Sequence, residues 1–150
     1  MGRLVSIDWG DRRVGLAASD ELRMLASPAG VIVRRAGKRP PVAELLRRID
    51  EIGDVDAVII GLPLNGDGHE TPRCAEVRAV AAAITERSGR AVSFVDERYS
   101  TARAHRALHE AGGKVGDHRH DIDAMTAAIL LQAVLDGGAV LPTDMAGDER

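Results

Sequence analysis

The sequence predicts one α/β domain built on a mixed five-stranded sheet with helices on both of its faces. Read in order, the expected elements are three strands, a helix, a strand, a helix, a strand and two helices. Three successive strands favour an antiparallel meander, whereas strands separated by helices favour parallel crossover connections. A chain of 150 residues is long enough to bury a single hydrophobic core.

The first two strands are expected to form a β-hairpin within Leu4–Gly15 and its continuation. Val5 and Ile7 are β-branched residues in an apolar run that ends at Asp8, and Val14–Ala18 resumes the apolar pattern after a polar turn. The sequence therefore predicts that Asp8 lies at the end of a central strand, where rigid backbone holds it and a ligand can reach it.

The middle of the chain continues the sheet and adds the first helix. A third extended run, Leu25–Val33, leads into the basic, proline-containing linker Arg34–Pro41. Val42–Ile52 has the apolar spacing of an amphipathic helix. Asp56–Gly61 predicts a buried strand because its apolar run has no polar alternation, and a loop follows over Leu62–Glu70.

The last third of the sequence alternates between helices and one further strand. Thr71 and Pro72 suit the start of a helix that Gly89 ends. The remaining expectations are a strand over Ala91–Val95, a helix from Ser100 or Thr101 to Ala111, a His-rich loop over 114–120 and an apolar helix over Asp121–Asp136. We predict that the domain covers residues 1–142 and that residues 143–150 form a disordered tail.

The amino-acid composition limits the cellular location and the class of binding partner that we expect for this protein. Cys74 is the only cysteine, which excludes an intrachain disulfide and a cysteine-based zinc cluster, and no apolar stretch is long enough to span a membrane. A cytoplasmic protein is therefore expected. The net charge is −3, but basic residues concentrate over Arg34–Arg48 and Arg98–His120. These basic stretches are compatible with a nucleic-acid partner. Alternatively, they are ordinary charged surface in contact with solvent.

Three carboxylates are candidates for a metal site. Asp8 ends the first strand, Glu97 follows the last, and Asp123 lies in the first turn of the final helix. Clustered carboxylates suit Mg²⁺ or Mn²⁺, which can activate water and stabilise the leaving oxygen of a phosphodiester. Each acid could instead be a solvated or capping residue. If Asp121 caps the final helix, a fourth ligand must come from Asp96, Asp11 or a substrate phosphate.

At this point four motifs together resemble those of the YqgF/RuvX-like proteins, which have the RNase H-like fold of Holliday junction resolvases. Asp8–Gly15 resembles the opening D-x-G-x-x-R-x-G of that family, and Gly61–Gly68 resembles its second motif. Val95–Thr101 and Ile122–Ala124 resemble the third and fourth. The resemblance implies a nuclease in which Asp8, Glu97 and Asp123 bind Mg²⁺ or Mn²⁺ and carry out catalysis.

Three residues depart from the pattern of that family. Gly66 and Tyr99 stand in the second and third motifs, where the family often has methionine and leucine, and both leave the proposed metal ligands unchanged. Asp121 stands where a basic or small residue is usual, which alters the expected charge of the metal site.

Arg13, Asn65 and Arg98 are the candidate substrate-binding residues. Arg13 lies within the strand pair, which favours a structural role in holding the hairpin or pairing with an acid over phosphate contact, and Asn65 could be an ordinary turn residue. His120 is a candidate general acid or base because it is the histidine nearest Asp123. Cys74 and Met125 are expected in the core.

The function that this resemblance implies is that of a metal-dependent nuclease of structured RNA or DNA, with the 5′-end maturation of pre-16S rRNA as the expected role. One alternative is a Holliday junction resolvase that acts on branched or single-stranded DNA and needs a symmetric dimer. Another is a ribosome-assembly or transcription factor that binds RNA without cutting it. We expect a monomer or a weak homodimer.

Overall fold

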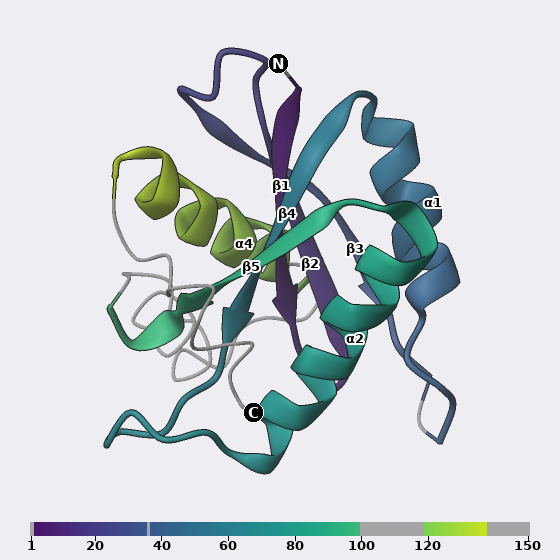
Figure 1. The fold of residues 1–150 in the computed structure, drawn as a ribbon, viewed down its shortest axis with the longest axis vertical. Coiled ribbons are helices and arrows are strands. Elements are labelled where there is room, and N and C mark those ends of the chain that lie inside the picture. Colours follow the sequence, from purple (N-terminus) through teal and green to yellow (C-terminus); the bar gives the residue numbers. More distant parts are fainter. Residues whose placement is uncertain (1, 36, 100–118, 138–150) are drawn as a thin grey trace.

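The computed structural model describes residues 2–35, 37–99 and 119–137, and its centre is a five-stranded sheet (Figure 1). The strand order is β3-β2-β1-β4-β5. Strand β1 pairs antiparallel with β2 and parallel with β4, while β2–β3 is antiparallel and β4–β5 is parallel. The predicted mixed sheet is confirmed. The strands are β1 Arg3–Trp9, β2 Arg13–Ser19, β3 Ala26–Val33, β4 Val55–Leu62 and β5 Ala91–Asp96.

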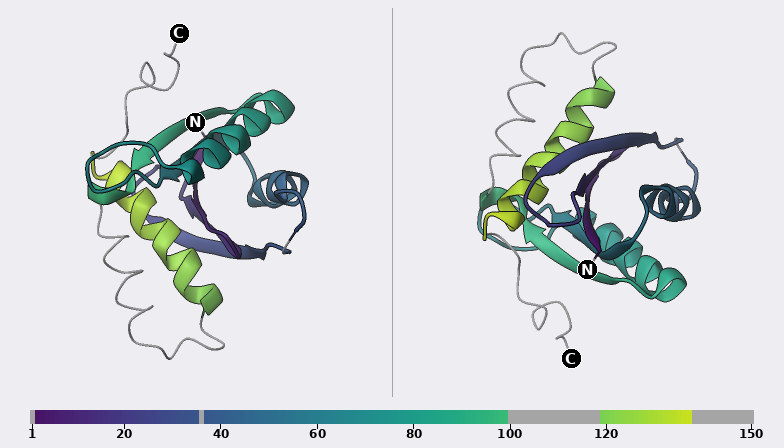
Figure 2. Two further views of the ribbon diagram at one scale, coloured as in Figure 1. Left: turned by 90° about the horizontal axis from the view of Figure 1, so that it is seen from below. Right: turned by 90° about the horizontal axis from the view of Figure 1, so that it is seen from above.

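Helices cover both faces of this sheet (Figure 2). Helices α1 (Val42–Ile52) and α2 (Pro72–Ser88) lie on one face, and α4 (Arg119–Leu135) lies on the other, across β1, β2 and β3. None of the helices in the described ranges is long and apolar enough to cross a membrane.

The larger core lies between the sheet and helices α1 and α2. Strands β1, β2 and β4 contribute Ile7, Leu16 and Ile60, and the helices contribute Leu45 and Ile84, all with side chains fully shielded from water. This face takes the large branched side chains, so alternate residues of the same strands remain for the opposite face.

The smaller core lies under α4, between that helix and strand residues Ala17, Ile59 and Val95. Ala17 and Ile59 pack there against Ala127, Leu130 and Leu131 of the helix. Beside this cluster, the buried Ser6 hydroxyl of β1 donates a hydrogen bond of 2.6 Å to the Ala127 carbonyl. Asp8 follows Ser6 by two residues and therefore lies on the same face as α4.

Most element boundaries agree with the sequence to within two residues, and α1 has the predicted bounds. Helix α4 begins at Arg119, so Asp121 lies inside the helix and is not its N-cap. Cys74 is buried as expected, but Met125 is 42% exposed, and its expected place in the core was wrong. The helix expected to end at Ala111 and the tail 143–150 lie outside the described residues.

Candidate functional site

The candidate site is centred on Asp8, near the end of β1. Asp8 is 4% exposed and is paired in register with Gly15 on β2. On the other side, Ile7 pairs with Ile60 of β4, which puts Asp8 beside Gly61. Because laterally adjacent residues of a sheet point to the same face, Asp8 lies between two glycines on the face that α4 covers.

The first of these glycines lets α4 approach the sheet closely enough to bring Asp123 next to Asp8. A β-carbon added at Gly15 would collide with the main-chain carbonyl of Asp123. The absence of a side chain at this position therefore allows α4 to rest directly on β2 at Asp123 and Ala124. As a result, the main chain of α4 fixes the position of Asp123.

The second glycine creates room for Glu97, which follows β5 directly. A β-carbon at Gly61 would lie 2.5 Å from Oε2 and 2.9 Å from Cγ of Glu97. Glu97 itself is 6% exposed and belongs to a short 3-10 turn, Glu97–Tyr99. The two glycines on either side of Asp8 therefore lie beneath Asp123 and Glu97 respectively.

A pocket of about 240 Å³ opens at the end of β1. Asp8 and Asp123 both line it, whereas Glu97 is not among its lining residues. Within residues 2–35, 37–99 and 119–137, no three His, Cys, Asp or Glu side chains form a group that could hold a metal ion. The remaining lining residues, Trp9, Gly10, Asp11, Arg12, Arg13 and Arg73, come mainly from the β1–β2 turn.

Arg13 contacts one of the predicted metal ligands. Its Nε donates a hydrogen bond of 2.5 Å to Oδ2 of Asp123, and the two side chains are 23% and 18% exposed. Of the roles open to Arg13 from the sequence, the structure shows the pairing with an acid. This ion pair ties the hairpin to α4 across 110 residues of sequence.

Arg98 joins the end of β5 to the loop after β4. Its guanidinium binds both carboxylate oxygens of Asp96 and donates a 3.2 Å hydrogen bond to the Gly66 carbonyl. Asp96 is 3% exposed, so this ion pair is largely withdrawn from solvent. The geometry gives Arg98 a structural role, and its contact with substrate remains a prediction.

Asn65 organises the same loop. Its Oδ1 accepts hydrogen bonds of 2.9 and 3.0 Å from the main-chain N–H groups of Asp67 and His69, which confirms its use as a turn residue. The Thr71 hydroxyl at the start of α2 donates to the Pro63 carbonyl at 3.1 Å. His120 lies in α4, but its side chain is outside the described part of the structure.

A cluster of Trp9, Arg34 and Glu76 supports the hairpin turn and was not anticipated from the sequence. The Trp9 indole donates to Glu76 Oε1 at 2.9 Å, and Arg34 binds both oxygens of Glu76 at 3.2 and 3.1 Å. Arg34 also stacks over the Trp9 ring, 4.9 Å from its centroid, and donates to the Gly10 carbonyl at 2.8 Å. The single tryptophan next to Asp8 was the available signal.

The cluster also changes the acidity of Glu76. The hydrogen bond from Arg34, assisted by that from Trp9, holds the pKa of the Glu76 carboxyl below its usual value, against the opposing effect of burial. The ionised form of Glu76 is therefore favoured in the folded protein.

Comparison with known proteins agrees with this architecture. A family model described as RuvX, Holliday junction resolvase, matches residues 2–137. A protein of Kineococcus radiotolerans named "Putative pre-16S rRNA nuclease" is 41% identical over 90% of this chain and 72% of its own length. A protein of the same name from Zymomonas mobilis is 40% identical over 93% of this chain and 83% of its own length.

Two solved structures share the fold. RuvC of T. thermophilus in complex with a Holliday junction substrate superposes with a TM-score of 0.52 at 17% identity, covering 94% of this chain and all of that one. The fowlpox virus Holliday junction resolvase gives a TM-score of 0.54 at 12% identity, covering 89% and 97%. These likenesses confirm the RNase H-like fold. The family match over residues 2–137 and the sequence identity to the two relatives show that the chain belongs to the RuvX family.

Proposed function

We propose that this protein is a metal-dependent nuclease that hydrolyses phosphodiester bonds of structured RNA and matures the 5′ end of pre-16S rRNA in the cytoplasm. The observation that carries the proposal is the position of Asp8 between Gly15 and Gly61, because the main chain of Asp123 lies over the first glycine and the side chain of Glu97 over the second. The names of the relatives support the choice of substrate.

The residues at this site fit a hard divalent cation by their chemistry. Carboxylate oxygens are the donors that Mg²⁺ and Mn²⁺ prefer, and the proposed ligands are Asp8, Glu97 and Asp123. Arg13 binds Oδ2 of Asp123, which leaves Oδ1 outside this ion pair. When bound, Mg²⁺ or Mn²⁺ would activate a water and stabilise the leaving oxygen of the phosphodiester.

The other residues of the pocket orient these ligands and bind substrate. Arg13 holds the carboxylate of Asp123 in place, and together with Arg12 it presents positive charge to a phosphate at the pocket. Asn65 and Arg98 shape the neighbouring loop, and we assign to that loop a contact with the nucleic acid beyond the cleaved bond.

The test is cleavage of a 5′-labelled RNA hairpin with a single-stranded 5′ extension, measured with Mn²⁺ and with EDTA. We expect Mn²⁺-dependent cleavage and a loss on the order of 100-fold or more in Asp8→Asn, Glu97→Gln and Asp123→Asn, because metal-bound charge stabilisation is worth several kcal/mol. Asp54→Asn is the matched control, since Asp54 is an exposed carboxylate just before β4, at the opposite end of that strand from Gly61.

Full activity in any of the three site variants would remove that residue from the ligand set. RNA binding without cleavage at any metal concentration would instead favour the non-catalytic assembly factor. Each variant must keep the thermal midpoint of the parent protein, so that a loss of activity reports on the site and not on folding.

A Holliday junction resolvase is the second candidate, because the family description and the RuvC–junction complex name that substrate. Two cuts across a junction require two active sites and hence a symmetric dimer. Cleavage of a four-way DNA junction by a dimeric form, at a rate above that on RNA, would select this candidate.

A further inference from the structure

Positive charge that is not engaged in ion pairs is concentrated next to the candidate site. Among the described arginines and lysines, most pair with acids. Four of those outside these pairs lie on the β1–β2 turn and on the linker between β3 and α1, and all four are exposed. One of the four is Arg12, on the turn. The other three are on the linker, and we call them the linker cations: Arg35, Lys38 and Arg39.

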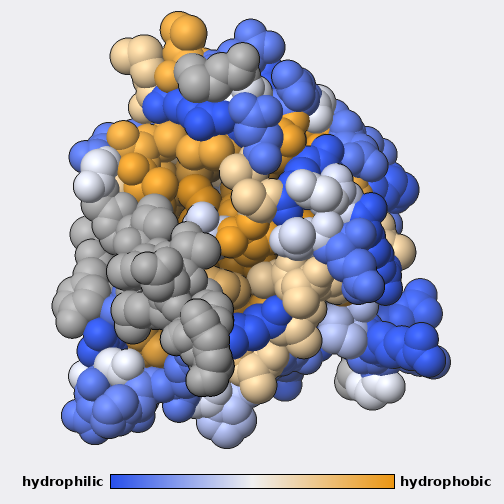
Figure 3. Space-filling view, in the orientation of Figure 1, coloured by the Kyte–Doolittle hydropathy of each residue, from blue (hydrophilic) through white to orange (hydrophobic). Residues whose placement is uncertain are grey.

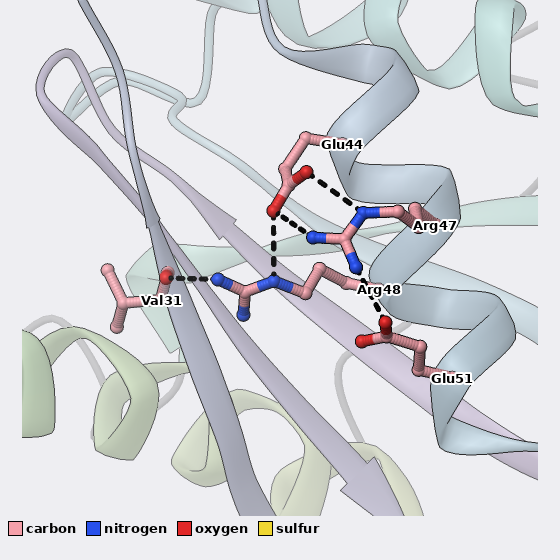
Figure 4. A network of polar contacts seen from close by, with 5 residues as sticks. All are labelled: Val31, Glu44, Arg47, Arg48 and Glu51. Carbon is pink, nitrogen blue, oxygen red and sulfur yellow. Dashed lines mark hydrogen bonds and ion pairs between the residues drawn. The ribbon is translucent and has the colours of Figure 1, made fainter.

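The neighbouring arginines of α1 contribute much less free charge. Glu44 accepts hydrogen bonds from both Arg47 and Arg48, and Glu51 accepts one from Arg47 (Figure 4). Arg48 also donates to the Val31 carbonyl of β3 at 3.2 Å, which ties α1 to the sheet. The acids of α1 therefore compensate its own arginines and leave the linker cations uncompensated.

The linker cations surround a defined cavity. A pocket of about 410 Å³ lies between the end of β3 and α1, and its charged lining residues are Arg34, Arg35, Lys38, Arg39 and Arg48, with Glu44 as the one acid. Figure 3 shows strongly hydrophilic side chains at the lower right of the molecule, where Figure 1 places this linker.

The linker beside this cavity is hydrogen-bonded to the turn that lines the candidate site. The Arg34 N–H donates to the Arg12 carbonyl at 2.8 Å, and the Arg34 side chain reaches the Gly10 carbonyl. The turn that lines the pocket of Asp8 and the linker that lines the basic cavity are thus adjoining backbone segments. Arg12, on the turn, accepts this hydrogen bond and also belongs to the lining of the first pocket.

We propose that the linker cations form a second contact for the phosphate backbone of the nucleic-acid substrate, away from the bond that is cleaved. A polyanion bound at Asp8 must extend beyond a pocket of this size, and the uncompensated charge beside the hairpin turn offers its phosphates favourable partners. In a protein of net charge −3, such a local surface directs where a polyanion binds. The inference rests on the proposed nuclease function.

The test measures RNA affinity separately from cleavage. In the Asp8→Asn background, fluorescence anisotropy of a labelled RNA hairpin with a 5′ extension gives Kd over a series of salt concentrations. We expect Lys38→Gln/Arg39→Gln to weaken binding about fivefold to tenfold and to reduce the slope of log Kd against log salt by about 0.7 for each lost phosphate contact.

The matched control is Arg3→Gln/Arg47→Gln, which removes the same net charge. Arg3 lies at the opposite end of β1, and Arg47 is held by acids on α1. Equal loss of RNA affinity in both double variants would overturn the proposal, and so would an unchanged affinity in the linker variant. Displacement of the labelled RNA by polyglutamate as readily as by unlabelled RNA would also overturn it.

The two proposals fail in different ways. A linker variant that loses affinity while the protein has no metal-dependent cleavage would refute the nuclease and keep the binding surface. Cleavage by the parent protein, together with unchanged affinity in the linker variant, would refute the binding surface alone.

Discussion

At the scale of single residues, two glycines do much to determine where the acids lie. Gly15 and Gly61 flank Asp8 in the sheet, and each has a predicted metal ligand placed directly over it. A side chain at either position would occupy the space that the main chain of Asp123 or the side chain of Glu97 now fills. On our proposal, metal binding by these acids therefore depends on two residues that carry no functional group.

We expect Gly61→Ala to destabilise the protein by about 1–3 kcal/mol and to reduce cleavage, because the added methyl group would lie 2.5 Å from Glu97 Oε2. Urea denaturation and the RNA assay measure the two effects. Gly66→Ala is the control for stability, since a β-carbon there meets no atom within 4 Å. Equal unfolding free energies for the two variants would show that Glu97 moves aside without cost.

At the scale of elements, the Trp9–Arg34–Glu76 cluster joins β1, the residue that follows β3, and α2. Glu76 has a lowered pKa in the folded state, so it releases protons that the unfolded chain would still bind. Its stabilising contribution is present above the unfolded pKa of about 4.3 and is lost as the pH falls through the lower folded value.

The difference in thermal midpoint between the parent protein and Glu76→Gln should therefore be largest near pH 7 and shrink as the pH falls below about 4.3. Because the Glu76 side chain is 39% exposed, solvent screening limits the effect, and we expect less than about 1 kcal/mol. Thermal melts from pH 7 to pH 3 measure it. A difference that stays constant over this range would mean that the charge of Glu76 contributes nothing.

The elements themselves were largely predictable, whereas their polar contacts were not. Apolar spacing marked α1 with its observed bounds, and turn residues marked the hairpin that carries Asp8. The Arg13–Asp123 contact joins distant segments, so its formation depends on how closely α4 approaches the sheet. The exposure of Met125 was not predictable either, because the sequence of a helix that is apolar on nearly all sides does not reveal which residue faces solvent.

At the scale of the whole molecule, α4 is the only described helix on its face of the sheet, and the small core beneath it holds Asp123 at the site. We expect Leu131→Ala to lower the unfolding free energy by about 2–5 kcal/mol, since Leu131 is fully buried in that core. Met125→Ala in the same helix should cost less than about 1 kcal/mol, because Met125 is largely outside the core. Chemical denaturation measures the unfolding free energy of both variants. Similar losses of unfolding free energy in the two would mean that α4 is held by contacts other than its buried face.

The contact between Gly15 and the main chain of Asp123 also has a consequence for the order in which activity arises during synthesis. The hairpin with Asp8 is synthesised before α4, which emerges only after all five strands of the sheet. Because Asp123 reaches its position only when α4 docks on β2, a nascent or truncated chain that lacks this helix lacks one of the three ligands that we propose. On our proposal, cleavage begins only when the fold is finished, which protects cellular RNA from partly made protein.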